Sequence, residues 1–308
     1  MVPYVARRLV QGIVVLFGVS VIVFVLSHLS GDPVELLLPD VATAAQVAAL
    51  REQLGLDRPL IVQFGIFLLR AVQGDFGDSI RFNSPAFPLV LSRLRATGIL
   101  TVAALTIAIV IALPMGVVAA LRRGSFIDQA LMSLSLLGYA VPTFYLGIML
   151  ILLVSVKLRL LPPSGFSTPQ QLILPALTLG LYQAALLARL LRRGLVDVYV
   201  SNYIRTARAK GLRERSVLLP HALKNALIPV VTIFGLQVGS LLSGAVITET
   251  VFSYPGVGLL LVQAIYQRDF AIVQAFVIVS AAIIVLVNLL IDMLYGYLDP
   301  RIRVYANP

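Results

Sequence analysis

The feature that most constrains this chain is a series of long apolar stretches without charge. A membrane-spanning helix needs about 20 apolar residues to cross a hydrocarbon core of about 30 Å. Hydrophobic residues are 59% of the 308 residues and charged residues 12%, whereas about 25% of a soluble domain is charged. This composition excludes a water-soluble globule, and with it a soluble basic nucleic-acid-binding protein. We expect an all-α integral membrane protein with six spans: Leu9 to Ser30, the stretch between Arg95 and Arg122, the stretch between Asp128 and Lys157, about Leu172 to Arg189, the stretch between Lys224 and Glu249, and Phe270 to Ile291.

The positions of the charges predict the orientation. Six spans place both ends of the chain on one side of the membrane. If that side is the cytoplasm, the inner segments hold 15 of the 24 basic residues and 5 of the 14 acidic ones, which is the whole net charge of +10. Lys and Arg concentrate in cytoplasmic loops, so both termini are predicted to be cytoplasmic. Nine of the 15 inner basic residues lie from Arg189 to Lys224.

The chain lacks the residues that catalysis or metal binding would need. It has no cysteine, and its two histidines, His28 and His221, lie far apart. No lysine follows a glycine, so the Gly-x4-Gly-Lys-Ser/Thr loop that cradles phosphates cannot occur. We therefore expect no catalytic residue, metal or cofactor in this chain, and any ATP would have to be bound by another polypeptide.

The long connection from about Gly31 to Arg95 is predicted to be outside and to hold two short helices. Thr43-x-x-Gln46 is typical of a capping box, and Gly55 can end that helix. A second, apolar helix from Pro59 to Gly74 should lie on the membrane surface or against the bundle, before a turn through Ser79. The connection is either an ordered cap or a docking surface for an outside partner.

The inner connection, about Gly194 to Asn225, should form a compact knob. A short helix ends at Gly211, and Ala207 four residues earlier should share its face, where small residues permit close approach of a partner. Leu212 to Leu219 can form a second short helix, which Pro220 should break. The alternative is a basic loop attracted to anionic lipid.

These residues carry a family resemblance. Ala-Arg-Ala-Lys-Gly-Leu at 207–212, followed by Pro-His-Ala-Leu-Lys-Asn-Ala-Leu-Ile-Pro at 220–229, resembles the cytoplasmic coupling motif of bacterial ABC importer permeases. Arg205 and Thr206 stand where that motif usually has glutamate and alanine, which is similar to the B-type permease subunit of dipeptide and oligopeptide importers. Further motifs of that subfamily are similar to residues 7–9, 18–20, 28–33, 54–59, 74–79 and 249–258.

The resemblance implies a type I ABC importer permease fold in the bacterial cytoplasmic membrane. It implies a first helix with its outer loop at 1–94, a transmembrane domain at 95–297 with a coupling segment at about 195–225, and a cytoplasmic tail at 298–308. The implied partners are a homologous second permease, two ATPase subunits that bind ATP and Mg²⁺, an extracytoplasmic solute-binding protein and membrane lipid. The implied substrate is peptide, with nickel, glutathione or haem as alternatives. The residues implied to couple to the ATPases are Arg205, Thr206, Ala207, Arg208, Ala209, Lys210, Gly211 and Leu212.

A few residues keep two interpretations. Glu249, at the end of the fifth span, either faces the pathway or an outer gate, or faces water. His28 is expected to be a hydrogen-bonded histidine at the membrane boundary rather than a pH sensor. Asp292 is expected to contact an arginine or water. Interruptions of the spans indicate either close packing or broken helices along a pathway: Gly116, Gly138, Gly147, Gly235, Gly239, Gly244, Pro114 and Pro142.

Two other classes compete with the importer. A stand-alone ion-driven carrier would usually carry charges in the middle of its spans, and the centres of these six have none. An intramembrane enzyme would need Ser, His, Asp or Glu groups that converge at depth, and two distant histidines do not supply them.

Overall fold

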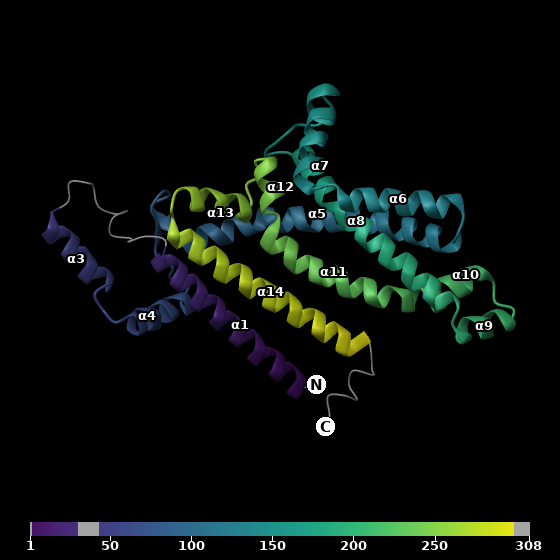
Figure 1. Cartoon of the computed structure of the whole chain (residues 1–308), viewed down its shortest axis with the longest axis horizontal. Helices are drawn as coiled ribbons and strands as arrows, with labels where there is room; N and C mark the ends of the chain where they lie inside the picture. The colour runs from purple at the N-terminus through teal and green to yellow at the C-terminus, as the bar shows by residue number, and fades with distance from the viewer. Residues whose placement is uncertain (1, 30–42, 299–308) are drawn as a thin grey trace. The chain divides into compact units, whose positions relative to one another are not determined.

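The structure is a computed structural model that describes residues 2–29 and 43–298. Most of the described chain is helical, and the one sheet in it has two strands of two residues each. The chain forms two compact units, residues 1–95 with 259–308 and residues 96–258. Each unit is described by itself (Figure 1).

In the first unit, α1 (Val2–Leu29) and α14 (Phe270–Leu298) lie side by side and run antiparallel (Figure 1). Near one end, Arg8 Nε lies 3.0 Å from Asp292 Oδ2, as expected for Asp292. Near the other end, Gln274 Nε2 donates to Ser27 Oγ at 2.7 Å. The two contacts fix the register of the pair.

The connection after α1 has the two predicted short helices. α3 (Ala44–Leu54) begins with the predicted capping box, because Gln46 N donates to Thr43 Oγ1 and Thr43 N donates to Gln46 Oε1. It ends at Gly55, whose φ of 69° is the left-handed value that favours glycine. α4 (Leu60–Val72) begins after Pro59 as predicted. The expected turn leads into a hairpin in which β1 (Asp78–Ser79) pairs with β2 (Ser84–Pro85).

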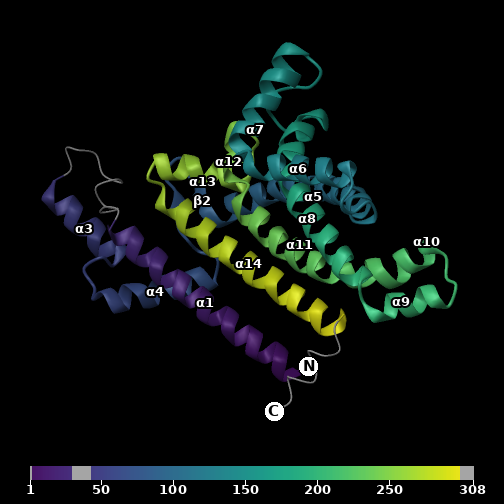
Figure 2. The ribbon, with the colours of Figure 1, turned by 45° about the vertical axis from the view of Figure 1, so that its right-hand side comes forward.

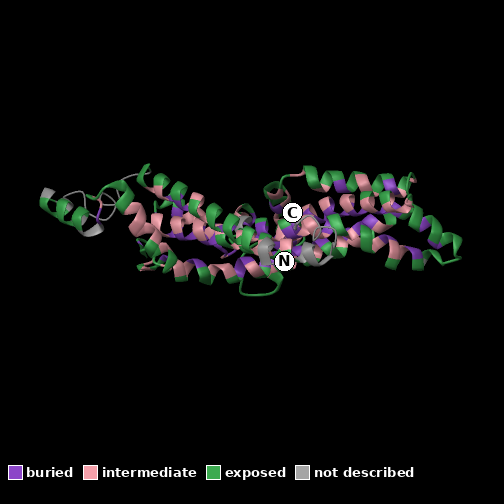
Figure 3. Ribbon diagram, turned by 90° about the horizontal axis from the view of Figure 1, so that it is seen from below, coloured by how far each residue is buried: buried purple, intermediate pink, exposed green. Residues whose placement is uncertain are grey.

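The second unit is built around α8 (Gln170–Tyr199). It packs against α6 (Phe126–Ala140), α7 (Thr143–Leu150), α11 (Lys224–Gly244) and α12 (Val246–Val251). α5 (Ala86–Leu121), which enters this unit at Ala96, also approaches α8 closely. A Cβ on Gly116 of α5 would lie 2.9 Å from the Ala188 carbonyl oxygen of α8, so this glycine serves close packing. In Figure 3 the outward-facing sides of many helices are exposed, as helices that meet lipid would be.

The number of spans depends on one bent pair. Five described helices are long and apolar enough to cross a membrane, and a sixth candidate is α6 with α7 and the π-helix η1 (Ile151–Lys157), bent by 99°. The bend falls at Pro142, which has no N–H to donate and holds Val141 in an extended conformation. Of the two predicted proline interruptions, Pro142 breaks a helix, while Pro114 lies inside α5.

Two boundaries differ from the prediction. α8 does not end near Arg189 but continues to Tyr199, because a helix can carry charged residues beyond the apolar core. Pro220 does not break the helix after α10 (Glu214–Val217), since the chain continues through the π-helix η2 (Leu218–Leu223) into α11. A π-helical turn pairs residues five apart, and its wider spacing accommodates a residue without N–H.

Candidate functional site

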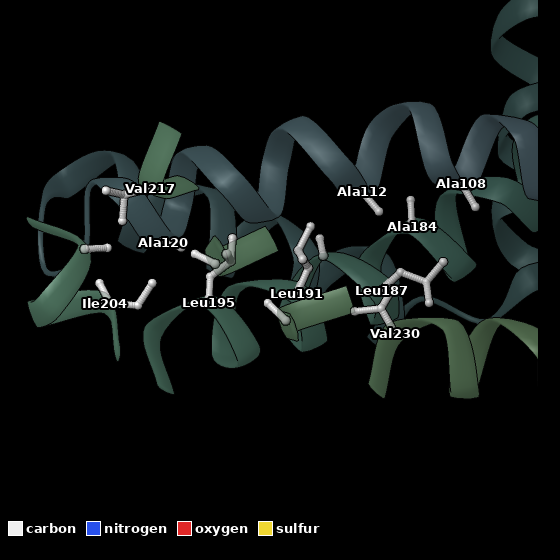
Figure 4. Packing of buried hydrophobic residues seen from close by; sticks show 14 residues of the cluster. Ala108, Ala112, Ala120, Ala184, Leu187, Leu191, Leu195, Ile204, Val217 and Val230 are labelled. Carbon is white, nitrogen blue, oxygen red and sulfur yellow. The ribbon is translucent and has the colours of Figure 1, made fainter. Parts of the chain in front are cut away.

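The predicted coupling segment lies where α8 ends and α11 begins, and it contains α9 (Asn202–Ala209) and α10 (Figure 2). One face of α9 is anchored in the chain's own core. Ile204 is fully buried and Ala207 is 8% exposed. They belong to an apolar cluster with Leu195 of α8 and Val217 of α10 (Figure 4), so the second unit positions this segment firmly.

The end of α9 is a Schellman motif. Gly211 N donates to Arg208 O at 2.9 Å and Leu212 N donates to Ala207 O at 3.4 Å, which is the bond pattern of that motif. Gly211 has φ 75°. The predicted helix end at Gly211 is therefore confirmed.

The predicted common face of Ala207 and Gly211 is wrong. Gly211 lies beyond the last helical residue, Ala209, and a Cβ on it would meet no atom of this chain within 4 Å. Ala207 faces the core. Of these two residues, Gly211 is the one that an approaching partner could reach.

The outer face of the segment is polar and basic. The exposed residues among the eight predicted coupling positions are Arg205, Thr206, Arg208, Ala209, Lys210, Gly211 and Leu212. Leu212 adds an apolar side chain that is 41% exposed. The surface therefore combines cations with one apolar contact.

Arg208 of α9 contacts both α8 and α10. Its Nε lies 2.7 Å from Glu214 Oε1 of α10, and its guanidinium carbon lies 5.2 Å from the centre of the Tyr199 ring of α8. The hydrogen bond to Glu214 raises the pKa of Arg208. Because both partners are well exposed, the pair contributes at most about 1 kcal/mol. Its effect is mainly to orient α10 against α9.

A second polar contact ties α9 to the start of α11. Asn225 Nδ2 donates to the Tyr203 hydroxyl at 2.8 Å and to the His221 carbonyl at 3.1 Å. The coupling segment and α11 therefore form one connected element.

Glu249, the other predicted site residue, is completely buried in α12. Thr97 Oγ1 of α5 donates to Glu249 Oε1 at 2.6 Å, and Gly258 N donates to Glu249 Oε2 at 2.7 Å. The same Thr97 oxygen accepts from Val257 N at 2.9 Å. The water-facing interpretation of Glu249 is therefore wrong, since its carboxylate is enclosed by this unit.

The segment from Glu249 to Gly258 folds around that carboxylate. A Cβ on Gly256 would overlap the Glu249 carboxyl group, and one on Gly258 would lie 2.6 Å from Val246 Cα. Tyr254 is also fully buried, and its hydroxyl donates to Ala96 O at 3.1 Å. Burial, with the nearby Glu249 charge, raises the pKa of Tyr254 to about 12, so Tyr254 stays neutral at physiological pH.

One buried ion pair was missed by the sequence analysis, which counted its members only as inner charges. Arg192 of α8 makes two 2.6 Å bonds to the carboxylate of Asp128 in α6. Gly124 N donates to the same carboxylate, and Asp128 is 2% exposed. The signal that could have found it is an acid in the first turn after a Ser125 cap, opposite an arginine-rich helix end.

No metal centre is apparent in the part of the chain that the structure describes. Among residues 2–29 and 43–298, no three His, Asp or Glu side chains gather closely enough to hold a metal ion. The described site features are the exposed basic face of the coupling segment, the buried Glu249–Thr97 contact and the buried Asp128–Arg192 pair.

The family of inner membrane components of binding-protein-dependent transport systems matches residues 112–304, and the family's N-terminal region matches residues 1–97. The chain belongs to this family of ABC importer permeases. It is a multi-pass protein of the inner membrane and a permease subunit.

Named relatives cover nearly the whole chain. It is 43% identical over 304 residues to the glutathione transport system permease protein GsiC of Escherichia coli K12, covering 98% of this chain and 99% of that protein. It is 41% identical over 318 residues to a protein of Brucella suis biovar 1 named as a peptide permease, covering 99% and 100%. The fold is similar to an inward-facing structure of the MetNI methionine ABC transporter, with a TM-score of 0.58, 18% identity and coverage of 68% of this chain and 96% of that one.

Proposed function

We propose that this permease forms half of a pathway through which an ATP-driven importer moves peptides into the cell. The observation that carries the proposal is the similarity, along almost the full length, to permeases named for glutathione and for peptides. Glutathione is itself a tripeptide, so both names indicate the same substrate chemistry. Nickel and haem remain alternatives within the family.

The proposed partners supply the functions that this chain lacks. A chain that cannot form a phosphate loop needs separate ATPase subunits to bind ATP and Mg²⁺, and half a pathway needs a homologous second permease. A solute-binding protein would deliver the peptide outside. We propose six spans with both termini cytoplasmic, and the division into 1–94, 95–297 and 298–308 as predicted from sequence.

The coupling segment would seat in a groove of an ATPase subunit. Its buried face is fixed to α8 and α11, so motion of the knob would be passed to both helices as one body. Its exposed cations would meet carboxylates of the ATPase. Gly211 would let the ATPase surface approach the backbone after α9.

At the other end of the second unit, Glu249 would act on an outer gate by positioning it. Its carboxylate joins α12, the turn before α13 (Val257–Tyr266) and the Thr97 hydroxyl. We propose that this contact keeps the turn from 252 to 258 in place while the pathway opens and closes.

Two variants of Gly211 test the coupling proposal. Gly211→Asn adds a side chain, and asparagine tolerates the positive φ of this position. No atom of this chain would lie within 4 Å of the added Cβ. Gly211→Val adds a β-branched side chain that does not tolerate this φ. We expect both variants to assemble with their partner subunits. The uptake of labelled glutathione and of a labelled dipeptide is then measured, together with ATPase activity.

We expect both variants to lose peptide uptake while the complex still co-purifies with its ATPases. If Gly211→Asn transports normally and only Gly211→Val fails, Gly211 serves the helix end and not the ATPase contact. Normal uptake in both variants would overturn the coupling role. If the unaltered complex takes up neither peptide, the substrate proposal fails whatever the variants do.

A further inference from the structure

α4 is apolar over most of its surface, yet none of its residues is buried. Its only polar side chains are Gln63 and Arg70, which lie seven residues apart and share one face. Gln63 is fully engaged, since Nε2 donates to the carbonyls of Leu56 and Arg58 and Oε1 lies 2.9 Å from His28 Nε2. The rest of the helix surface is apolar, and an apolar face of that width must be covered by something apolar.

The contacts of α4 with α1 fall within the candidate membrane span of α1. The Phe64 ring lies 5.8 Å from Phe17 and 5.3 Å from Phe24, and the Phe67 ring lies 5.9 Å from Phe24. The span in α1 runs from Val5 to Leu29, so Phe17 is at its middle. At 1.5 Å per residue, Phe24 lies about 7 Å and Phe17 about 18 Å below the Leu29 end.

Beside these rings, α4 carries an exposed apolar stripe. Ile61 is 81% exposed, Leu69 67% and Val72 88%, and their spacing puts them on one helical face. The neighbouring span α1 has the same character, with Val14 64% exposed at mid-depth. At the middle of a membrane span, an exposed apolar side chain is expected to meet acyl chains.

We propose that α4 is embedded in the bilayer leaflet at the Leu29 end of α1, with its exposed stripe covered by lipid acyl chains. Under the proposed orientation this is the outer leaflet. With 13 residues, about 20 Å long, α4 is too short to cross a hydrocarbon core of about 30 Å. As a helix it satisfies its own backbone bonds there. The first connection is then anchored in the membrane and is not a purely aqueous cap, independently of what the importer carries.

The chain has no cysteine, so a single nitroxide can be placed on it without removing other thiols. The variants are Ile61→Cys and Val72→Cys on the stripe, Val14→Cys as the lipid control and Ser164→Cys, in the exposed turn after η1, as the water control. Each full-length chain is labelled, assembled with its partner subunits and placed in vesicles of phosphatidylethanolamine and phosphatidylglycerol. Power saturation then compares collisions with oxygen, which enters lipid, and with a water-soluble nickel chelate.

We expect both stripe labels to collide with oxygen and to be shielded from the nickel chelate, as the Val14 label is, while the Ser164 label shows the reverse. Nickel access at the stripe equal to that at Ser164 would overturn the proposal, because α4 would then lie in water. Shielding of the stripe from both reagents would also overturn it, because a protein surface, such as the second permease, would then cover α4. All four substitutions are at exposed positions, so loss of folding is not expected.

Discussion

At the residue scale, the Thr97 hydroxyl has two partners, since it donates to Glu249 and accepts from Val257 N. Thr97→Val keeps the shape and removes the hydroxyl, so a buried carboxylate oxygen and a buried N–H each lose a bond. Losing such buried hydrogen bonds costs about 1–3 kcal/mol. We expect the melting temperature of the purified chain in detergent to fall in Thr97→Val and to be largely kept in Thr97→Ser, which retains the hydroxyl. Equal melting of the two variants would show that the hydroxyl bonds contribute nothing.

The Glu249 contact also shows where sequence reasoning stops. An acidic residue at the end of an apolar span is unusual, and this position indicates Glu249 as a candidate functional residue. Its partner Thr97 lies 152 residues earlier, and a threonine within an apolar stretch gives no sign of what it faces. The need for glycine at 256 and 258 is likewise apparent only once the carboxylate is placed beside them.

At the scale of elements, the Asp128–Arg192 pair joins the first turn of α6 to α8 one turn before the coupling segment. Removing one partner of a buried ion pair leaves a charge uncompensated, at a cost of about 3 kcal/mol or more when both are fully buried. Arg192 is 28% exposed on its side chain, so we expect a somewhat smaller loss for Asp128→Ala. Thermal unfolding of the single variants and of Asp128→Ala with Arg192→Ala measures the coupling.

The double variant should be more stable than the sum of the single losses predicts, because each single variant strands the other charge. Arg193→Ala is the control, since Arg193 is exposed on the same helix and should change little. Strict additivity in the cycle would show that the pair is not energetically linked.

Elements with local signals were predicted well, and those set by packing were not. The capping box at Thr43, the start of α4 at Pro59 and the end of α9 at Gly211 each follow from one or two neighbouring residues. The passage of the helix through Pro220 does not, because a π-helical turn depends on how η2 packs between α10 and α11. Packing also explains the wrong prediction for Ala207. The sequence indicated a face open to a partner, but Ala207 packs into the buried apolar cluster.

At the scale of the whole molecule, the topology rests on whether the bent pair α6–α7 crosses the membrane. If it crosses, there are six spans and the coupling segment lies on the same side as the turn between α5 and α6. If it returns to its own side, there are five, and α8 would carry the coupling segment to the opposite side, away from any ATPase. The absence of cysteine allows single exposed positions to report this: Arg123→Cys after α5, Ser164→Cys after η1 and Arg205→Cys in α9.

In right-side-out vesicles, a membrane-impermeant maleimide should label Ser164→Cys and leave Arg123→Cys and Arg205→Cys unlabelled until the membrane is opened. The physical reason is the charge distribution: the basic residues from Arg189 to Lys224 favour the cytoplasmic side, and a 99° bend at a proline is compatible with crossing when neighbouring helices cover the break. Protection of Ser164 together with Arg123 would contradict the six-span layout, and labelling of Arg205 from outside would contradict the proposed contact with ATPase subunits. Labelling after detergent treatment must reach all three positions, which controls for reactivity and leaves sidedness as the difference measured.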